Sequence, residues 1–236
     1  MHQSDERISE SKFLISPLQV DSMLAWLEHI CVPDPQFPHN RIGTIYYDTR
    51  DLSAFEDSRN GITTRSKYRL RWYESPSRKP SPRVSCYLEI KRKVGGGRSK
   101  ERHEVELPRS ILVDDPLRVA TKRWRLSKVL DESPLSPNVS MDPIIAIKYD
   151  RRRYIELESR IRISVDVEIE CESVNDELLP NLGISSLPHC VLEVKGEIAE
   201  FPRSLLPMAP IMEKTSYSKY VRGLEQASLI HQERII

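Results

Sequence analysis

Strict alternation of charged and apolar residues is the feature that most restricts the fold of this chain. In residues 67–73, KYRLRWY, the cations Lys67, Arg69 and Arg71 are separated by bulky apolar residues. Successive side chains of a β-strand point to opposite faces of a sheet. The segment is therefore predicted to be a strand with one cationic face and one apolar face.

The same alternation recurs in the segments CYLEIKRKV, KERHEVEL, AIKYDRRRY, RIRISVDVEIE and CVLEVKGE. Taken together, the residues at every second position are almost purely ionic and rich in arginine, and in most of these segments the residues between them are apolar. The predicted charged faces carry Tyr87, Glu89, Lys91, Lys93, Lys100, Arg102, Glu104, Glu106, Tyr149, Arg151, Arg153, Arg160, Arg162, Ser164, Asp166, Glu168, Glu170, Glu193, Lys195 and Glu197.

Two architectures explain these faces. In the first, an antiparallel sheet packs its apolar face on helices and exposes its charged face to water. In the second, the sheet closes into a barrel whose ionic face lines a polar tunnel. Arginine suits bidentate recognition of phosphate, and burying so many like charges would be costly unless water or a polyanion fills the space. Carboxylates on the same face would hold a divalent metal that bridges phosphate oxygens.

The pattern as a whole indicates a mainly β protein of the α+β class, predicted to form a single domain over residues 1–236. Helical periodicity or capping signals favour helices over 16–30, 116–130 and 217–230. The Asn60-Gly61 pair is typical of a turn between two strands. Strands, about eight in number, are predicted at 7–15, 41–49, 62–73, 84–94, 101–107, 144–155, 160–171 and 188–198.

Composition excludes several kinds of protein. The net charge of +1 argues against nucleic acid as the main partner, so an anion site must arise from local sorting of charge. The sequence has no apolar run of membrane-spanning length and no hydrophobic signal-peptide core near its start, which predicts a cytoplasmic protein. A membrane partner in another chain stays open, as does the oligomeric state.

The order of the short motifs provides a further clue. The chain reads ERISESKF, IYYDT, YRLRWY, YLEIKRK, KERHEVEL, YDRRRY, RIRISVD, VLEVKGE and YSKY. In this order the motifs resemble the VTC domain, the polyphosphate polymerase domain of vacuolar transporter chaperones and their bacterial relatives. That family belongs to the triphosphate tunnel metalloenzymes, which are CYTH-like. The resemblance runs from Glu6 to Tyr220 and covers nearly the whole chain.

The resemblance implies a closed antiparallel β-barrel of about eight strands, flanked by a few α-helices and forming a tunnel for a triphosphate. It also implies a divalent cofactor, Mn²⁺ or Mg²⁺. The implied catalytic residues are Arg69, Arg71, Lys91, Arg151 and Arg162. The implied triphosphate- or polyphosphate-binding residues are Lys12, Arg69, Arg71, Lys91, Lys100, Tyr149, Arg151, Arg162, Lys195 and Lys219. The implied metal ligands are Glu193, with Glu10, Asp166 and Glu168 as further candidates.

Three activities agree with these expectations. The first is a metal-dependent polyphosphate polymerase that transfers the γ-phosphate of ATP to a growing chain. The second is a triphosphatase that acts on nucleotide, thiamine or inorganic triphosphate, and the third is a non-catalytic module that binds polyanions. Many tunnel hydrolases carry ExExK in their first strand, whereas Ile8 replaces the first acid here and leaves Glu10 and Lys12. This departure favours the polymerase over the hydrolase.

Overall fold

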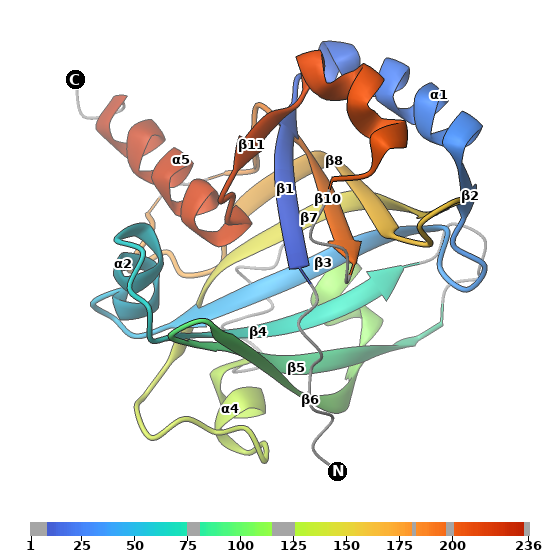
Figure 1. Cartoon of the computed structure of the whole chain (residues 1–236). Coiled ribbons are helices and arrows are strands. Elements are labelled where there is room, and N and C mark those ends of the chain that lie inside the picture. The colour runs from blue at the N-terminus through green and yellow to red at the C-terminus, as the bar shows by residue number, and fades with distance from the viewer. Residues whose placement is uncertain (1–8, 75–80, 115–125, 181–182, 197–200, 234–236) are drawn as a thin grey trace. The chain divides into compact units, whose positions relative to one another are not determined.

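The computed structural model describes residues 9–74, 81–114, 126–180, 183–196 and 201–233. Its strands are β1 (Ser9–Ile15), β2 (Cys31–Pro33), β3 (His39–Asp48), β4 (Arg65–Glu74), β5 (Arg83–Val94), β6 (Gly97–Pro108), β7 (Asp142–Glu156), β8 (Arg162–Ser173), β9 (Ser185–Ser186), β10 (Cys190–Gly196) and β11 (Glu213–Thr215). Its helices are η1 (Pro17–Gln19), α1 (Val20–Ile30), α2 (Ser53–Arg59), η2 (Ser110–Asp114), α4 (Leu126–Asp131), η3 (Arg203–Ile211) and α5 (Lys219–Glu233). Figure 1 shows these elements.

The strands belong to one 11-stranded sheet in the order β11-β1-β10-β8-β7-β3-β4-β5-β6, with β2 beside β7 and β9 beside β8. All eight predicted strands are present, to within a few residues, as β1, β3 to β8 and β10. The predicted closed barrel of eight strands is wrong, because no pairing in the described part of the chain joins β11 to β6. Alternation assigns side chains to faces but does not reveal whether the two edges of a sheet meet. The three additional strands have only two or three residues each, too few to show alternation.

Two of the predicted helices are confirmed: 16–30 is found as η1 followed by α1, and 217–230 as α5. The third, 116–130, lies mostly outside the described residues, and its described end is the start of α4. The turn predicted at Asn60-Gly61 instead ends helix α2, and Gly61 takes the left-handed conformation with φ of 71°. Glycine often follows the C-cap of a helix in this conformation.

The sequence pattern did not predict helix α2, because the helix is short and a residue outside it stabilises its N-terminus. The carboxylate of Asp48, at the end of β3, accepts hydrogen bonds from the backbone amides of Ala54 and Phe55, each at 2.9 Å. These amides belong to the first turn of a helix and have no partner within it. A seven-residue helix capped from the preceding strand leaves no clear periodicity in the sequence.

The chain packs as two compact units, each built from segments that are far apart in sequence. The first unit comprises 1–41, 149–169 and 188–217, and the second comprises 42–148, 170–187 and 218–236. In the first unit, Met23, Leu24 and Leu27 of α1 pack in a core with the apolar faces of β1, β8 and β10. Helix α1 also contacts η3, as Figure 1 shows.

The core of the second unit lies on the apolar faces of β3, β4 and β5. Leu70, Trp72 and Leu88 are fully buried there, together with residues of η2 and α4. Gly43 on β3 leaves room for the indole of Trp72, because a β-carbon at this position would lie 2.1 Å from the ring. The alternation therefore identified the buried faces of both units correctly.

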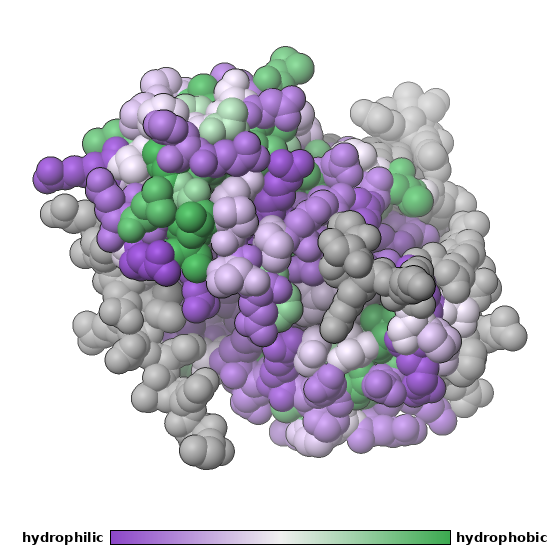
Figure 2. All heavy atoms as spheres, turned by 90° about the vertical axis from the view of Figure 1, so that its right-hand side faces the viewer, coloured by the Kyte–Doolittle hydropathy of each residue, from purple (hydrophilic) through white to green (hydrophobic). Residues whose placement is uncertain are grey.

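The exposed surface agrees with the high proportion of charged residues. Hydrophilic side chains predominate on the face shown in Figure 2, and hydrophobic ones gather there in limited groups.

Of the helices that the structure describes, none combines the length and the apolar character that a bilayer crossing requires.

Candidate anion and metal sites

The buried carboxylate of Glu89 on β5 is surrounded by cations in the second unit. The shortest distances from its oxygens to cationic nitrogens are 2.5 Å for Lys100, 2.7 Å for Arg69, 3.8 Å for Arg102 and 4.0 Å for Arg71. We call these five residues the cationic cluster. Within it, positive charges outnumber negative charges by three. Such a surplus attracts anions, and the two guanidinium groups of β4 suit phosphate oxygens.

The register of β4, β5 and β6 explains how this cluster forms. One row of directly opposite residues contains Arg69, Glu89 and Arg102, and another contains Lys67, Lys91 and Lys100. The first row places the carboxylate between two cations. Like charges that face one another directly across strands destabilise a sheet. The row of three lysines is therefore typical of a face that binds an anion.

Ionisation in the cationic cluster reflects its positive potential. Burial raises the pKa of Glu89, but the neighbouring arginines and lysine outweigh burial and lower this pKa to about 2. Burial also raises the pKa of Tyr46, on the adjacent strand β3. The positive charges of Arg69, Arg71 and Lys67 outweigh this effect and lower the Tyr46 pKa to about 8. A buried phenol that loses its proton this easily indicates strong stabilisation of negative charge at that point.

A second group of ionic residues lies in the first unit, where β1 pairs with β10. Lys12 is directly opposite Glu193, and Glu10 is directly opposite Lys195. The Nζ atom of Lys12 lies 3.2 Å from Oε1 of Glu193 and 3.3 Å from Oε1 of Glu10. The Nζ atom of Lys195 lies 3.3 Å from Oε2 of Glu193. Glu193 therefore contacts two ammonium groups at once.

Arg151 on β7 joins this group to β8. Its guanidinium donates two hydrogen bonds to the fully buried carboxylate of Asp166, at 2.5 and 2.6 Å, and its Nη2 lies 3.2 Å from Glu193. The ring of Tyr149 lies 5.4 Å from the same guanidinium. Burial lowers the pKa of Arg151, but the two carboxylates outweigh burial and raise it well above its ordinary value. Arg151 therefore stays charged in the interior of the unit.

We call Glu10, Lys12, Arg151, Asp166, Glu193 and Lys195 the mixed-charge cluster. Its three carboxylates balance its three cations, so it has no surplus charge of the kind found in the cationic cluster. Burial lowers the pKa of Lys12, but Glu193 and Glu10 outweigh it and raise this pKa. The two clusters thus differ in chemistry: one is strongly cationic, and the other is a balanced network.

Two carboxylates of the mixed-charge cluster, Glu10 and Glu193, are the candidates to hold a divalent metal. Glu10 and Glu193 each place a carboxylate oxygen within 3.3 Å of the same ammonium nitrogen, so two hard oxygen donors converge on one point. Mg²⁺ bound with phosphates commonly uses one or two carboxylates, and Mn²⁺ has similar oxygen preferences. No group of three or more acidic, histidine or cysteine residues suited to a metal occurs in the described part of the chain. A metal held by these two carboxylates alone would take its remaining ligands from substrate and water.

The two other predicted metal ligands have different surroundings. Both oxygens of Asp166 accept hydrogen bonds from Arg151. Glu168 has a positive φ of 50°, which interrupts the regular alternation of β8, and its side chain is 71% exposed. Its carboxylate lies 3.6 Å from Arg41. The structure thus brings Glu10 and Glu193 together but directs Glu168 elsewhere.

The remaining predicted binding residues are found on both units. Arg162 is directly opposite Lys195 on the neighbouring strand, and its side chain is exposed. Lys91 is exposed in the row of lysines. Lys219 begins α5 in the second unit and is buried. The preceding residue, Ser218, accepts a hydrogen bond from Lys67 at 2.9 Å, so the start of α5 lies beside one of the lysines of that row.

Three residues of the candidate site were missed in the sequence. Glu89 and Arg102 lie on the predicted charged faces, but neither is among the site residues that the resemblance implies. Tyr46 lies in the IYYDT motif, which served only to establish the order of motifs. For Glu89 the sequence did contain a signal, because it is a single acid on a predicted face whose other charged residues are lysines. The proximity of Tyr46 to the arginines depends on the pairing of β3 with β4, which no local pattern shows.

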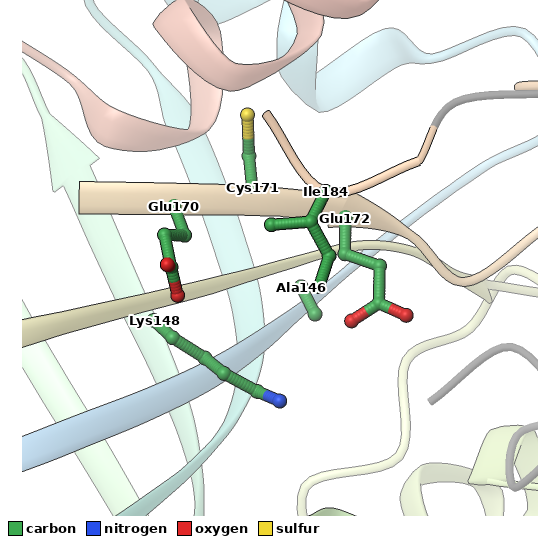
Figure 3. Close-up of a pocket in the computed structure, with 6 residues that line it drawn as sticks. All are labelled: Ala146, Lys148, Glu170, Cys171, Glu172 and Ile184. Atoms are coloured by element: carbon green, nitrogen blue, oxygen red, sulfur yellow. The ribbon is translucent and has the colours of Figure 1, made fainter. Parts of the chain in front are cut away.

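A small pocket in the second unit is not part of either cluster. It is lined by Ala146, Lys148, Glu170, Cys171, Glu172 and Ile184 (Figure 3). Two acids and one lysine supply its charges, and none of the predicted site residues lines it. Its composition does not favour a phosphate group.

Of the comparisons with known proteins, the match to a family model agrees with the order of motifs. A family model of the VTC domain matches residues 7–228. A search of curated proteins finds no match. Among solved structures, a protein from Vibrio parahaemolyticus described as a candidate adenylate cyclase is similar, with 14% identity, a TM-score of 0.44, and coverage of 89% of this chain and 94% of that chain. The Mediator head module of Schizosaccharomyces pombe matches with 7% identity, a TM-score of 0.38, and coverage of 86% and 88%.

Proposed function

Because this chain belongs to the VTC domain family, we propose that it is a metal-dependent polyphosphate polymerase that transfers the γ-phosphate of ATP to a polyphosphate chain. One observation carries the proposal: four cations surround a single buried carboxylate in the cationic cluster. Enzymes that transfer phosphoryl groups depend mainly on positioning and on neutralising charge. A cluster with this surplus of positive charge is suited to both tasks.

In the proposed mechanism, Glu89 holds the cations in place before substrate binds. Arg69 and Lys100 contact its carboxylate at 2.7 and 2.5 Å, which restricts the position of both charged groups. Each guanidinium has five N–H donors, so Arg69 and Arg71 can bind phosphate oxygens without releasing Glu89. The site is thereby organised in advance for an anion, which lowers the cost of ordering these long side chains on binding.

The mixed-charge cluster would hold the divalent metal through Glu193 and Glu10. When bound, Mn²⁺ or Mg²⁺ would neutralise charge on the phosphate oxygens as a Lewis acid. Lys12, whose ammonium group contacts both carboxylates, would supply positive charge to a phosphate group bound beside the metal in the first unit. Arg151, held in place by Asp166, would supply further positive charge in the same unit. No nucleophile on the protein is required, because a terminal phosphate oxygen of the chain attacks the γ-phosphorus of ATP while the bond from that phosphorus to the β,γ-bridging oxygen breaks and ADP leaves.

The decisive experiment identifies the phosphate acceptor. Purified protein is incubated with ATP and Mn²⁺, and the products are divided between a gel stained for polyphosphate and an assay for free phosphate. Long chains on the gel are expected. Release of free phosphate without chains would replace the polymerase with a triphosphatase, and binding of ATP without turnover would leave only a polyanion-binding module.

Glu193→Gln is expected to weaken the activation of turnover by Mn²⁺ at least about tenfold, because a neutral amide is a poorer metal ligand than a carboxylate. Binding of triphosphate in the absence of metal should change little, because the cationic cluster is intact. A Mn²⁺ titration of activity, together with calorimetry in metal-free buffer, separates the two effects. Glu213→Gln, at an exposed position on β11, is the matched control. An unchanged Mn²⁺ titration in Glu193→Gln would count against this residue as a ligand.

A further inference from the structure

Building on the phosphate-binding function proposed above, we propose that the hydroxyl group of Tyr46 is a further phosphate ligand, which accepts a hydrogen bond from Arg69 and donates its own proton to a phosphate oxygen. Tyr46 precedes Tyr47 in the IYYDT motif, and these two residues point to opposite faces of β3. Tyr47 belongs to the apolar core, whereas Tyr46 lies beside the cations of β4.

The ring of Tyr46 is held in a fixed position. It is 7% exposed and stacks on the ring of Tyr220 from α5, with a centroid distance of 4.8 Å and an angle of 18°. Tyr220 is fixed in turn, because its hydroxyl donates a hydrogen bond of 2.5 Å to the buried carboxylate of Asp48. Phe55 of α2 packs against Tyr220 edge to face. Elements β3, α2 and α5 therefore jointly fix the position of the ring, and the phenol has little freedom to turn away from β4.

The cations that surround the hydroxyl of Tyr46 can donate hydrogen bonds to it but cannot accept its proton. Its oxygen accepts a hydrogen bond from Arg69, and the charges of Arg71 and Lys67 also lower its pKa. Arginine and lysine donate hydrogen bonds but cannot accept them. The hydroxyl of Tyr220 is already committed to Asp48. These neighbours therefore cannot accept the proton of Tyr46, whereas a phosphate oxygen held by the same arginines can.

The ionisation of Tyr46 provides a signal for this contact. Because its pKa is about 8, the phenol is largely protonated near pH 7 and largely ionised near pH 9. A phenolate cannot donate to phosphate and repels it. Binding of an anion at this place must therefore return the proton and remove the phenolate absorbance above pH 8. A tyrosine remote from the bound anion would show no such response to a ligand.

The test uses inorganic tripolyphosphate without metal, and compares the wild-type chain with Tyr46→Phe and Tyr47→Phe. Phenylalanine keeps the stacked ring in Tyr46→Phe and removes only the hydroxyl. Tyr47→Phe is the matched control, because its hydroxyl donates to the backbone carbonyl of Leu126 within the core. Affinity is measured by calorimetry near pH 7, and phenolate absorbance is recorded near pH 9 before and after saturation. Thermal unfolding of each variant verifies that it is folded.

Tyr46→Phe is expected to bind tripolyphosphate about 10- to 100-fold more weakly than wild type, as for loss of a hydrogen bond to a charged group. Tyr47→Phe should match wild type in affinity. Saturation should remove phenolate absorbance in wild type and in Tyr47→Phe, but not in Tyr46→Phe. Equal affinity in folded Tyr46→Phe, or a phenolate signal that saturation leaves unchanged, would overturn the role of Tyr46 and leave the polymerase proposal standing. Failure of wild type to bind tripolyphosphate at all would overturn both.

Discussion

Replacement of Arg69 or Arg71 with alanine is expected to lower the rate of phosphoryl transfer at least about 100-fold, while the protein stays folded. Both residues lie on the charged face of β4 and approach the same buried carboxylate, Glu89. In the proposed mechanism they hold the triphosphate and neutralise the charge that develops on it. Triphosphate binding should weaken as well, because one fixed guanidinium is lost from the cluster.

The fold should survive either substitution because Glu89 keeps other partners. Lys100 lies 2.5 Å from its carboxylate and Arg102 lies 3.8 Å away, so the buried charge stays compensated. Arg83→Ala on β5 is a suitable control, since this arginine is 56% exposed and pairs with Glu106 at the surface. Its turnover should equal that of wild type. Wild-type turnover in Arg69→Ala or in Arg71→Ala would refute the assignment of the cationic cluster.

Asp166→Ala is expected to lower the free energy of unfolding by about 3–5 kcal/mol, the usual cost of removing one partner of a buried ion pair. The carboxylate of Asp166 is fully buried and accepts two hydrogen bonds from Arg151, which is itself almost fully buried. Without Asp166, the guanidinium would keep only Glu193, and positive charge would exceed negative charge in the mixed-charge cluster. Denaturant unfolding of wild type and variant measures the difference.

Two further variants separate charge pairing from other effects of Asp166→Ala. Glu168→Ala removes an acid from the same strand whose side chain is 71% exposed, and should cost less than about 1 kcal/mol. Arg151→Met combined with Asp166→Leu replaces the pair with apolar groups, which often restores the stability lost when one partner is removed. A loss below about 1 kcal/mol in Asp166→Ala would mean that the pair is not needed to hold Arg151.

Much of the architecture was predictable because alternation is a direct consequence of strand geometry. Trp72 and Leu70 are fully buried, whereas Arg69 and Arg71 lie on the opposite face of β4, as the alternation predicts. All eight predicted strands and two of the predicted helices are present. The closure of the sheet was not predictable, because each strand has the same pattern of faces in an open sheet and in a barrel. The exposed position of Glu168 was not predictable either, because a single residue with positive φ interrupts the alternation on which the prediction depends.

The sequence alone determined which residues are strand residues, which side of each strand is charged, and which family the motif order resembles. These properties are local, since they depend on the two-residue period of a strand and on short segments read in order. Only the tertiary structure decided how the charges combine. It placed four cations around Glu89 in one unit and balanced three acids against three cations in the other. It also brought the phenol of Tyr46 beside Arg69. These contacts depend on strand register and on packing between distant segments, which alternation within one strand does not specify.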